Sequence, residues 1–208
     1  MDSEEREGEG DLKGVKQIKA SVRNKTQVGF YFDQSRCSGC FTCILACKQW
    51  HSSEVEAGNW RRVETFESGH FPDLKVSFLS ISCFHCETPA CLSNCPTSAI
   101  HKREESGVVL VDPASCLGQE GCGLCRDSCP YHVPNYNPND DQKMEKCDFC
   151  YERMEKGKRP ICVEACPMHA LDAGDLEEME IKYGRGREAE GFHYSPETRP
   201  SIILKGKY

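Results

Sequence analysis

Hydrophobic residues in this chain occur in short runs that are separated by charged or glycine-containing turns. The β-branched run "VVLV" at 108–111 follows a charged turn and predicts a strand that returns towards the next motif. The segment "PMHALDAGD" at 167–175 begins in a similar way. Residues 174–184, "GDLEEMEIKYG", predict a short acidic helix that ends at glycine. Residues 152–160, "ERMEKGKRP", predict a solvated basic loop.

The composition indicates that an ordinary hydrophobic core would be thin. Apolar residues make up 38% of the 208 residues, but 16 residues are cysteines, and the apolar fraction without them is only about 30%. A bound group must therefore supply part of the interior. The formal net charge of -7 argues against a nucleic-acid partner, because nucleic acids select for basic surfaces.

No segment has the pattern of a secretory signal or a membrane span. Residues 1–25 lack the apolar stretch of a signal peptide, and the longest apolar runs are far too short to cross a bilayer. Arg61 and Arg62 are adjacent, but no hydrophobic stretch follows them. We therefore interpret them as an ordinary surface pair rather than a twin-arginine signal.

The cysteines form four groups of four. Every group ends in the spacing C-x3-C, and a proline directly follows the last cysteine of three groups. Group three departs from the compact run C-x2-C-x2-C-x3-C-P, because five residues separate its first two cysteines. The groups are Cys37, Cys40, Cys43 and Cys47; Cys83, Cys86, Cys91 and Cys95; Cys116, Cys122, Cys125 and Cys129; and Cys147, Cys150, Cys162 and Cys166.

Three kinds of site compete for this pattern. Disulfides are typical of small secreted proteins, and the tight C-x2-C pairs are poorly placed to bridge each other. Zinc uses two such pairs, but it requires neither the further cysteine nor the terminal Cys-Pro. Iron–sulfur clusters explain the whole pattern, because three cysteines of a run bind one cluster and the fourth binds the other cluster of a pair. The sequence therefore predicts iron–sulfur clusters.

Five segments carry a resemblance to a known family: "GFYFDQSRCSGCFTCILACK", "LSISCFHCETPACLSNCPTSAIHKRE", "VVLVDPASC", "KCDFC" and "RPICVEACPMHALDAGD". They resemble the iron–sulfur (B) subunits of the dimethyl sulfoxide reductase family, which are electron-transfer subunits of molybdopterin oxidoreductases. The resemblance covers about residues 28–206, and "SIILK" near the C-terminus is similar to the last strand of the family. A three-residue insertion in group three and a charged N-terminal extension depart from the family pattern.

The resemblance implies four [4Fe-4S] clusters and a pairing of group one with group four and of group two with group three. The members of a pair exchange their fourth ligands. The implied ligands are Cys37, Cys40, Cys43 and Cys166 for cluster 1; Cys83, Cys86, Cys91 and Cys129 for cluster 2; Cys116, Cys122, Cys125 and Cys95 for cluster 3; and Cys147, Cys150, Cys162 and Cys47 for cluster 4.

Two positions near these ligands need a separate interpretation. In the inserted loop "LGQEG", Gly118 and Gly121 permit a bulge, so we expect cluster 3 to keep four irons. The alternative is a three-iron cluster that leaves Cys116 unused. His85 lies between two ligands of a complete cysteine set, and we expect it to act outside the ligand set or at the surface.

We therefore expect an α+β fold of two bacterial-type two-cluster ferredoxin units with short strands and helical turns. Residues 1–26 would form a charged N-terminal extension, and residues 27–172 the four-cluster domain. Within this domain, 27–80 would pair with 130–172, and 81–129 would hold the other cluster pair. Residues 173–208 would form a C-terminal extension with a short helix and the last strand.

The resemblance implies a protein that relays electrons between a membrane quinol/quinone subunit and a molybdopterin (Mo or W) catalytic subunit in anaerobic respiration. The sequence contains no catalytic constellation, so we expect electron transfer only. The protein would associate with the membrane through a membrane anchor subunit, and it would be cytoplasmic or exported folded with a twin-arginine-bearing partner. The alternatives are a subunit of a formate dehydrogenase or hydrogenase-linked complex, a free polyferredoxin and a zinc-organised interaction module.

Overall fold

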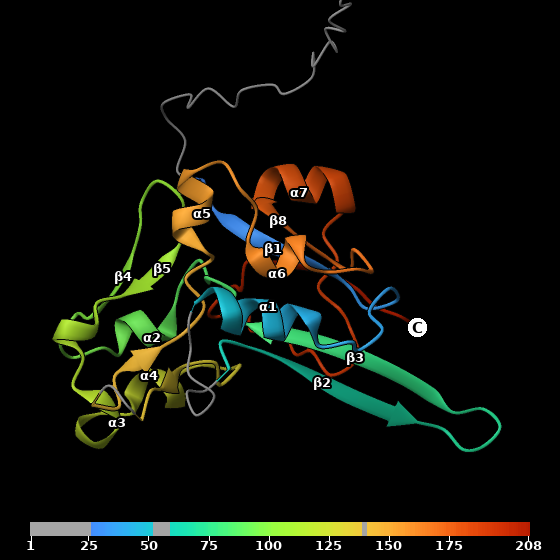
Figure 1. Cartoon of the computed structure of the whole chain (residues 1–208), viewed down its shortest axis with the longest axis horizontal. Helices are drawn as coiled ribbons and strands as arrows, with labels where there is room; N and C mark the ends of the chain where they lie inside the picture. The colour runs from blue at the N-terminus through green and yellow to red at the C-terminus, as the bar shows by residue number, and fades with distance from the viewer. Residues whose placement is uncertain (1–25, 52–58, 139–140) are drawn as a thin grey trace, which may run out of the picture.

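The computed structural model describes residues 26–51, 59–138 and 141–208 (Figure 1). The predicted N-terminal extension therefore lies almost wholly outside the described residues. The strands are β1 (Val28–Asp33), β2 (Arg61–Ser68), β3 (Lys75–Ser82), β4 (Ile100–Lys102), β5 (Val109–Val111), β6 (Asn135–Tyr136), β7 (Met144–Glu145), β8 (Leu171–Asp175) and β9 (Ile202–Lys205). The helices are α1 (Thr42–Trp50), α2 (Ala90–Ser93), α3 (Gly118–Gly121), α4 (Leu124–Asp127), α5 (Tyr151–Glu155), α6 (Ile161–Glu164) and α7 (Leu176–Tyr183), with one 3-10 turn, η1 (Pro113–Ser115).

A three-stranded sheet in the order β8-β1-β9 forms the centre of the fold. Strand β1 runs antiparallel to β8 and parallel to β9. All six residues of β1 are buried, because Phe30 and Phe32 pack into the main core while Tyr31 packs against α7 on the other face. The predicted acidic helix and the predicted last strand are both present, as α7 and β9.

Cysteines and aromatic residues share the main core. Phe84 makes edge contacts with the rings of Tyr131 and Phe192, while Cys83 and Cys147 belong to the same buried cluster. Apolar side chains other than cysteine therefore supply only part of the interior, as the composition indicated.

Two antiparallel hairpins flank this core. The strands of the β4–β5 hairpin pair from Ile100 opposite Val111, and β5 is the strand predicted at 108–111. The β2–β3 hairpin is longer and extends away from the rest of the molecule (Figure 1). The sequence analysis did not predict it.

Short helices pack in two pairs that bring the cysteine groups together. Helix α1, which carries Cys43 and Cys47, contacts α6, which carries Cys162 (Figure 1). Helix α2, which carries Cys91, contacts α4, which carries Cys125. In the described part of the protein, no helix is long and apolar enough to span a membrane.

One prediction about charged segments was confirmed only in part, and another was wrong. Residues 155–159 are exposed as expected, but α5 occupies the start of the stretch, and the buried Arg153 pairs with Glu164 and lies over the ring of Trp50. Arg61 is not a surface residue, since only 3% of it is exposed. Helix α1 packs against β2, and the local polarity of the sequence does not indicate this contact.

Candidate metal centre

The backbone turns in the same way after the first cysteine of each group. The residue two positions later has a positive φ in every case, at Gly39 (68°), His85 (45°), Gly118 (76°) and Phe149 (63°). This turn directs a backbone N–H at the sulfur, and the amides of Gly118 and Phe149 lie 3.4 Å from the sulfurs of Cys116 and Cys147. The repeat therefore extends from the sequence to the backbone.

The Cys-Pro pairs also have a structural explanation. After Cys95, Cys129 and Cys166, the third residue donates its backbone N–H to the cysteine carbonyl and has a positive φ. The N–H of the fourth residue then points at the sulfur of the same cysteine. The fixed φ of proline suits this turn. The donors are Ala99 for Cys95, Val133 for Cys129 and Ala170 for Cys166.

The structure gathers the cysteines assigned to cluster 1 around one cavity. Residues from α1, from the loop before it and from the turn after α6 line this cavity. The Cys37 thiol lies close enough to the other three for their charges to raise its pKa, although burial raises it more. The four cysteines are Cys37, Cys40, Cys43 and Cys166.

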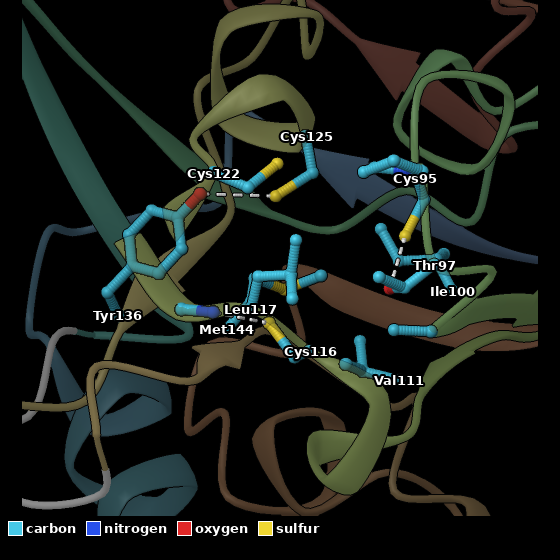
Figure 2. A pocket seen from close by; sticks show the side chains of 13 residues that line it. Cys95, Thr97, Ile100, Val111, Cys116, Leu117, Cys122, Cys125, Tyr136 and Met144 are labelled. Atoms are coloured by element: carbon cyan, nitrogen blue, oxygen red, sulfur yellow. Dashed lines mark hydrogen bonds between the residues drawn. The ribbon is translucent and has the colours of Figure 1, made fainter. Parts of the chain in front are cut away.

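The cysteines assigned to cluster 3 surround a second cavity, shown in Figure 2. The sulfurs of Cys95, Cys116, Cys122 and Cys125 lie around it together with the side chains of Ile100, Val111, Tyr136 and Met144. The two cavities have the same volume, about 20 Å³ each, although only the second contains the insertion of group three.

The inserted residues form α3, which is tied to a neighbouring loop. The Gln119 amide donates to the carbonyl of Gln142 at 3.0 Å, and Lys143 Nζ donates to the carbonyl of Cys116 at 2.7 Å. These bonds hold Cys116 at the cavity although its spacing is wide. The bulge expected from Gly118 is present, and Gln119 and Glu120 are exposed.

The remaining eight cysteines form two sets, one fully buried and one partly buried. Burial raises the pKa of Cys86 and Cys91 to about 12, and the nearby Cys83 and Cys129 thiols raise it further. Burial likewise raises the pKa of Cys47 and Cys150 to about 12, next to Cys162. The charge of Cys47 also raises the pKa of Cys147, after the larger effect of burial. The sets correspond to the ligands implied for clusters 2 and 4.

These sites fit a [4Fe-4S] cluster by the chemistry of their donors. Each set offers four sulfurs, and backbone N–H groups point at several of them, which stabilises thiolates. In this protein the buried thiols without metal are neutral, so iron must replace their protons. In the described residues all sixteen cysteines are free of disulfides. Which sulfurs bind which cluster stays a prediction.

His85 is buried and not a surface residue. Its Nδ1 accepts a hydrogen bond from the backbone N–H of Val109 at 3.0 Å. Its ring packs edge-on against the ring of Phe149, and the two ring centres lie 5.3 Å apart. Burial first, and then the charges of Lys146 and Lys102, hold the pKa of His85 well below its usual range. The ring is therefore neutral and helps to fix the turn between two cysteines.

Three features of the site were not found from the sequence. The positive φ positions at Gly39 and Gly118 carried a glycine signal, but His85 and Phe149 at the equivalent positions carried none. The Tyr136 hydroxyl lies 3.3 Å from the Cys125 sulfur, although the two are eleven residues apart. The buried Arg61 is the third feature.

Comparison with known proteins agrees with this geometry. Two family models described as "4Fe-4S dicluster domain" match residues 36–100 and 74–176. The B chain of anaerobic dimethyl sulfoxide reductase from Escherichia coli K12 is 42% identical over 188 residues, which is 86% of this sequence and 89% of that protein. The corresponding B chain from Haemophilus influenzae is 40% identical over 190 residues, with the same shares. The B subunit of sulfite dehydrogenase from Allochromatium vinosum is 34% identical over 199 residues, covering 85% and 81%.

Fold, cysteine sets and matches together define an iron–sulfur electron-transfer subunit of an oxidoreductase complex, which is not itself a catalytic enzyme. This protein belongs to the family of the B chains of anaerobic dimethyl sulfoxide reductases.

Proposed function

We propose that this protein binds four [4Fe-4S] clusters and relays electrons between a molybdopterin (Mo or W) catalytic subunit and a membrane quinol/quinone subunit. When bound, each cluster accepts one electron and passes it on. The ligand sets proposed are those implied by the resemblance, and residues 27–172 would form the four-cluster domain. The protein would be attached to the membrane through its partners.

The observation that carries this proposal is the sharing of short helices between cysteine sets. Helix α1 contributes Cys43 to the first cavity and Cys47 to the buried set with Cys162. The segment of α4 contributes Cys125 to the second cavity, and Cys129 just after it lies near Cys83. This arrangement supports the proposed exchange of fourth ligands, which is expected of two-cluster ferredoxins.

The contacts between sets support a linear order of clusters 1, 4, 2 and 3. Cys43 of the first set lies near Cys162 of the fourth. Lys146 links the fourth and second sets, because it donates to the carbonyl of Cys147 at 3.2 Å and its charge acts on Cys91. Clusters 1 and 3 would then be the ends of the relay.

Exposed apolar residues near both ends support docking of two different partners. Phe41 (47%) and Leu45 (65%) are exposed beside the first cavity, and Leu117 (54%) and Leu124 (50%) beside the second. Apolar side chains that remain exposed around a ligand site are typical of interaction surfaces. We assign one end to the catalytic subunit and the other to the membrane anchor subunit.

Gentle anaerobic purification of the tagged protein from its native host tests the proposal. A much larger subunit that contains molybdenum or tungsten pterin should co-purify, together with a membrane-spanning subunit. Extraction with detergent is needed to keep the membrane-spanning subunit in solution. Recovery of the protein only as a monomer that carries electrons between soluble donors would support the free polyferredoxin instead, and a formate dehydrogenase or hydrogenase partner would support the other alternative.

A further inference from the structure

Arg61, the first residue of β2, is buried between α1 and the core. Its Nη1 donates to Ser80 Oγ at 2.9 Å, and its Cζ lies 5.0 Å from the centre of the Phe30 ring. Its Nη2 is buried and has no hydrogen-bond partner among the residues that the structure describes. One side of the guanidinium is therefore fixed, while the other presents an unused donor.

The charge of this guanidinium needs a compensating negative charge. A buried ion without a partner is costly, and within residues 26–51, 59–138 and 141–208 no carboxylate pairs with Arg61. Burial opposes its charge, but the negative charge of four nearby cysteines, which become thiolates when they bind iron, raises the pKa of Arg61 above its usual value. These cysteines are Cys162, Cys43, Cys147 and Cys47.

These four cysteines come from two cluster sets. Cys43 belongs to the set of cluster 1, and the other three belong to the set of cluster 4. Cys43 and Cys47 lie one turn apart on α1, directly above β2, and Ser80 Oγ links the guanidinium to Cys43 Sγ at 3.9 Å. A single fixed cation thus serves both sites.

We propose that Arg61 is a buried counter-charge shared by clusters 1 and 4, which raises the reduction potentials of both. The inference rests on the proposed function. Reduction adds a negative charge to a site whose thiolates are already negative, and a fixed cation stabilises the reduced form more than the oxidised form. Clusters 2 and 3, which do not face Arg61, would be unaffected.

The test compares two substitutions in the anaerobically purified protein with the subunits that co-purify. Arg61→Gln removes the charge and keeps a donor for Ser80, whereas Arg61→Lys keeps the charge. Arg185→Gln, which removes an exposed guanidinium that pairs with Glu180, is the control for a general loss of charge. The four midpoint potentials are measured by EPR-monitored redox titration, and single Cys→Ser variants assign the signals.

In Arg61→Gln, the equilibrium constants for reduction of clusters 1 and 4 should fall at least tenfold. This corresponds to a decrease of about 59 mV in each midpoint potential for a one-electron couple. Arg61→Lys and Arg185→Gln should leave all four potentials near their original values. Loss of clusters 1 and 4 in Arg61→Gln but not in Arg61→Lys also supports a need for charge. Unchanged potentials in Arg61→Gln, or equal defects in both Arg61 variants, would overturn the inference. The iron content of the unsubstituted protein tests the proposed function separately.

Discussion

At the scale of single residues, two hydroxyls reach predicted ligand sulfurs in the cavity of Figure 2: Tyr136 lies 3.3 Å from the Cys125 sulfur, and Thr97 lies 3.7 Å from the Cys95 sulfur. Burial, and then the bond to Cys125, raises the pKa of Tyr136 above its usual value. The phenol therefore stays protonated and donates a hydrogen bond to the Cys125 thiolate. Hydrogen bonds to sulfur raise the reduction potential of a cluster.

Tyr136→Phe should therefore lower the potential of cluster 3 alone, by tens of mV, the order expected for one hydrogen bond to sulfur. EPR-monitored redox titration measures the shift. Tyr183→Phe is the matched control, because it removes a hydroxyl that bonds Asp172 and no sulfur. Equal shifts in both variants, or no shift in Tyr136→Phe, would show that the Tyr136 hydroxyl does not tune the potential of cluster 3.

The sequence predicted the cysteines of the site but not the other side chains that contact them. Cysteine spacing indicated the four groups, because the cysteines of a group lie close together in the sequence, whereas the exchange of fourth ligands between groups was implied by the family resemblance. The burial of Arg61 and the contact of Tyr136 with Cys125 depend on elements that meet only after folding. A run such as "NWRRVETF" gives no local sign of which arginine will be covered.

At the scale of elements, α3 holds the widened group three in place. Gly118 has a φ of 76°, and a Cβ added there would lie 2.6 Å from the carbonyl oxygen of Asp141. Gly157 has a similar φ of 69°, but an added Cβ would meet nothing within 4 Å. Substitution of both glycines therefore distinguishes the effect of a strained backbone, which both share, from the effect of a clash, which occurs only at Gly118.

Gly118→Ala should push Cys116 from the cavity and produce a three-iron EPR signal in the oxidised protein. Gly157→Ala should lower the free energy of unfolding by about 1 kcal/mol, because alanine is disfavoured in the left-handed conformation, and it should leave the EPR spectrum unchanged. A three-iron signal already present in full amount in the unsubstituted protein, and unaltered by Cys116→Ser, would mean that Cys116 is not a ligand.

Helix α7 is fixed to the central sheet by Asp172 of β8. This carboxylate accepts bonds from Tyr183 Oη at 2.5 Å and Lys182 Nζ at 3.1 Å, and it pairs with Arg159. Tyr183 also stacks on Tyr31, with ring centres 3.8 Å apart. Burial opposes ionisation, but the bonds from Tyr183, the Ala173 amide and Lys182 hold the pKa of Asp172 below its usual value.

Asp172→Asn should lower the free energy of unfolding by about 1 kcal/mol without loss of iron. Because the pKa of Asp172 is lowered on folding, this stabilisation is present above the unfolded pKa of about 3.9 and is lost as pH falls through the folded pKa. Urea unfolding should thus give the same difference at pH 7.5 and pH 5. Asp73→Asn, at an exposed loop position, is the control, and a difference that vanishes by pH 5 would contradict the assignment.

Elements with a clear pattern were predicted, and those without one were not. The acidic helix before Gly184 and the strand near 108–111 had strong local signals. The β2–β3 hairpin mixes polar and apolar residues on both strands, and the N-cap residue of α1, Phe41, provides no side-chain cap. Both elements form because the core and the cysteine turns hold them.

At the scale of the whole molecule, cysteine sets connect elements that lie far apart in the sequence. The first cavity joins the loop at Cys37 to the turn at Cys166, and the second joins Cys95 to Cys116. Bound clusters would therefore act as crosslinks as well as electron carriers.

Removal of iron by a chelator under anaerobic reducing conditions should abolish the cooperative unfolding transition. The near-UV circular dichroism of the aromatic core should be lost at the same time, because Phe84, Phe149 and Tyr131 pack among the cysteines. An iron-free, colourless protein that retains the near-UV spectrum would show that the core stands without clusters.

Quantitative iron, zinc and acid-labile sulfide analysis of the anaerobically purified protein tests the central claim most directly. Four [4Fe-4S] clusters require about 16 iron atoms and about 16 sulfides for each molecule, with no stoichiometric zinc. The account predicts this result. Zinc without sulfide, or about eight irons from only two clusters, would contradict it.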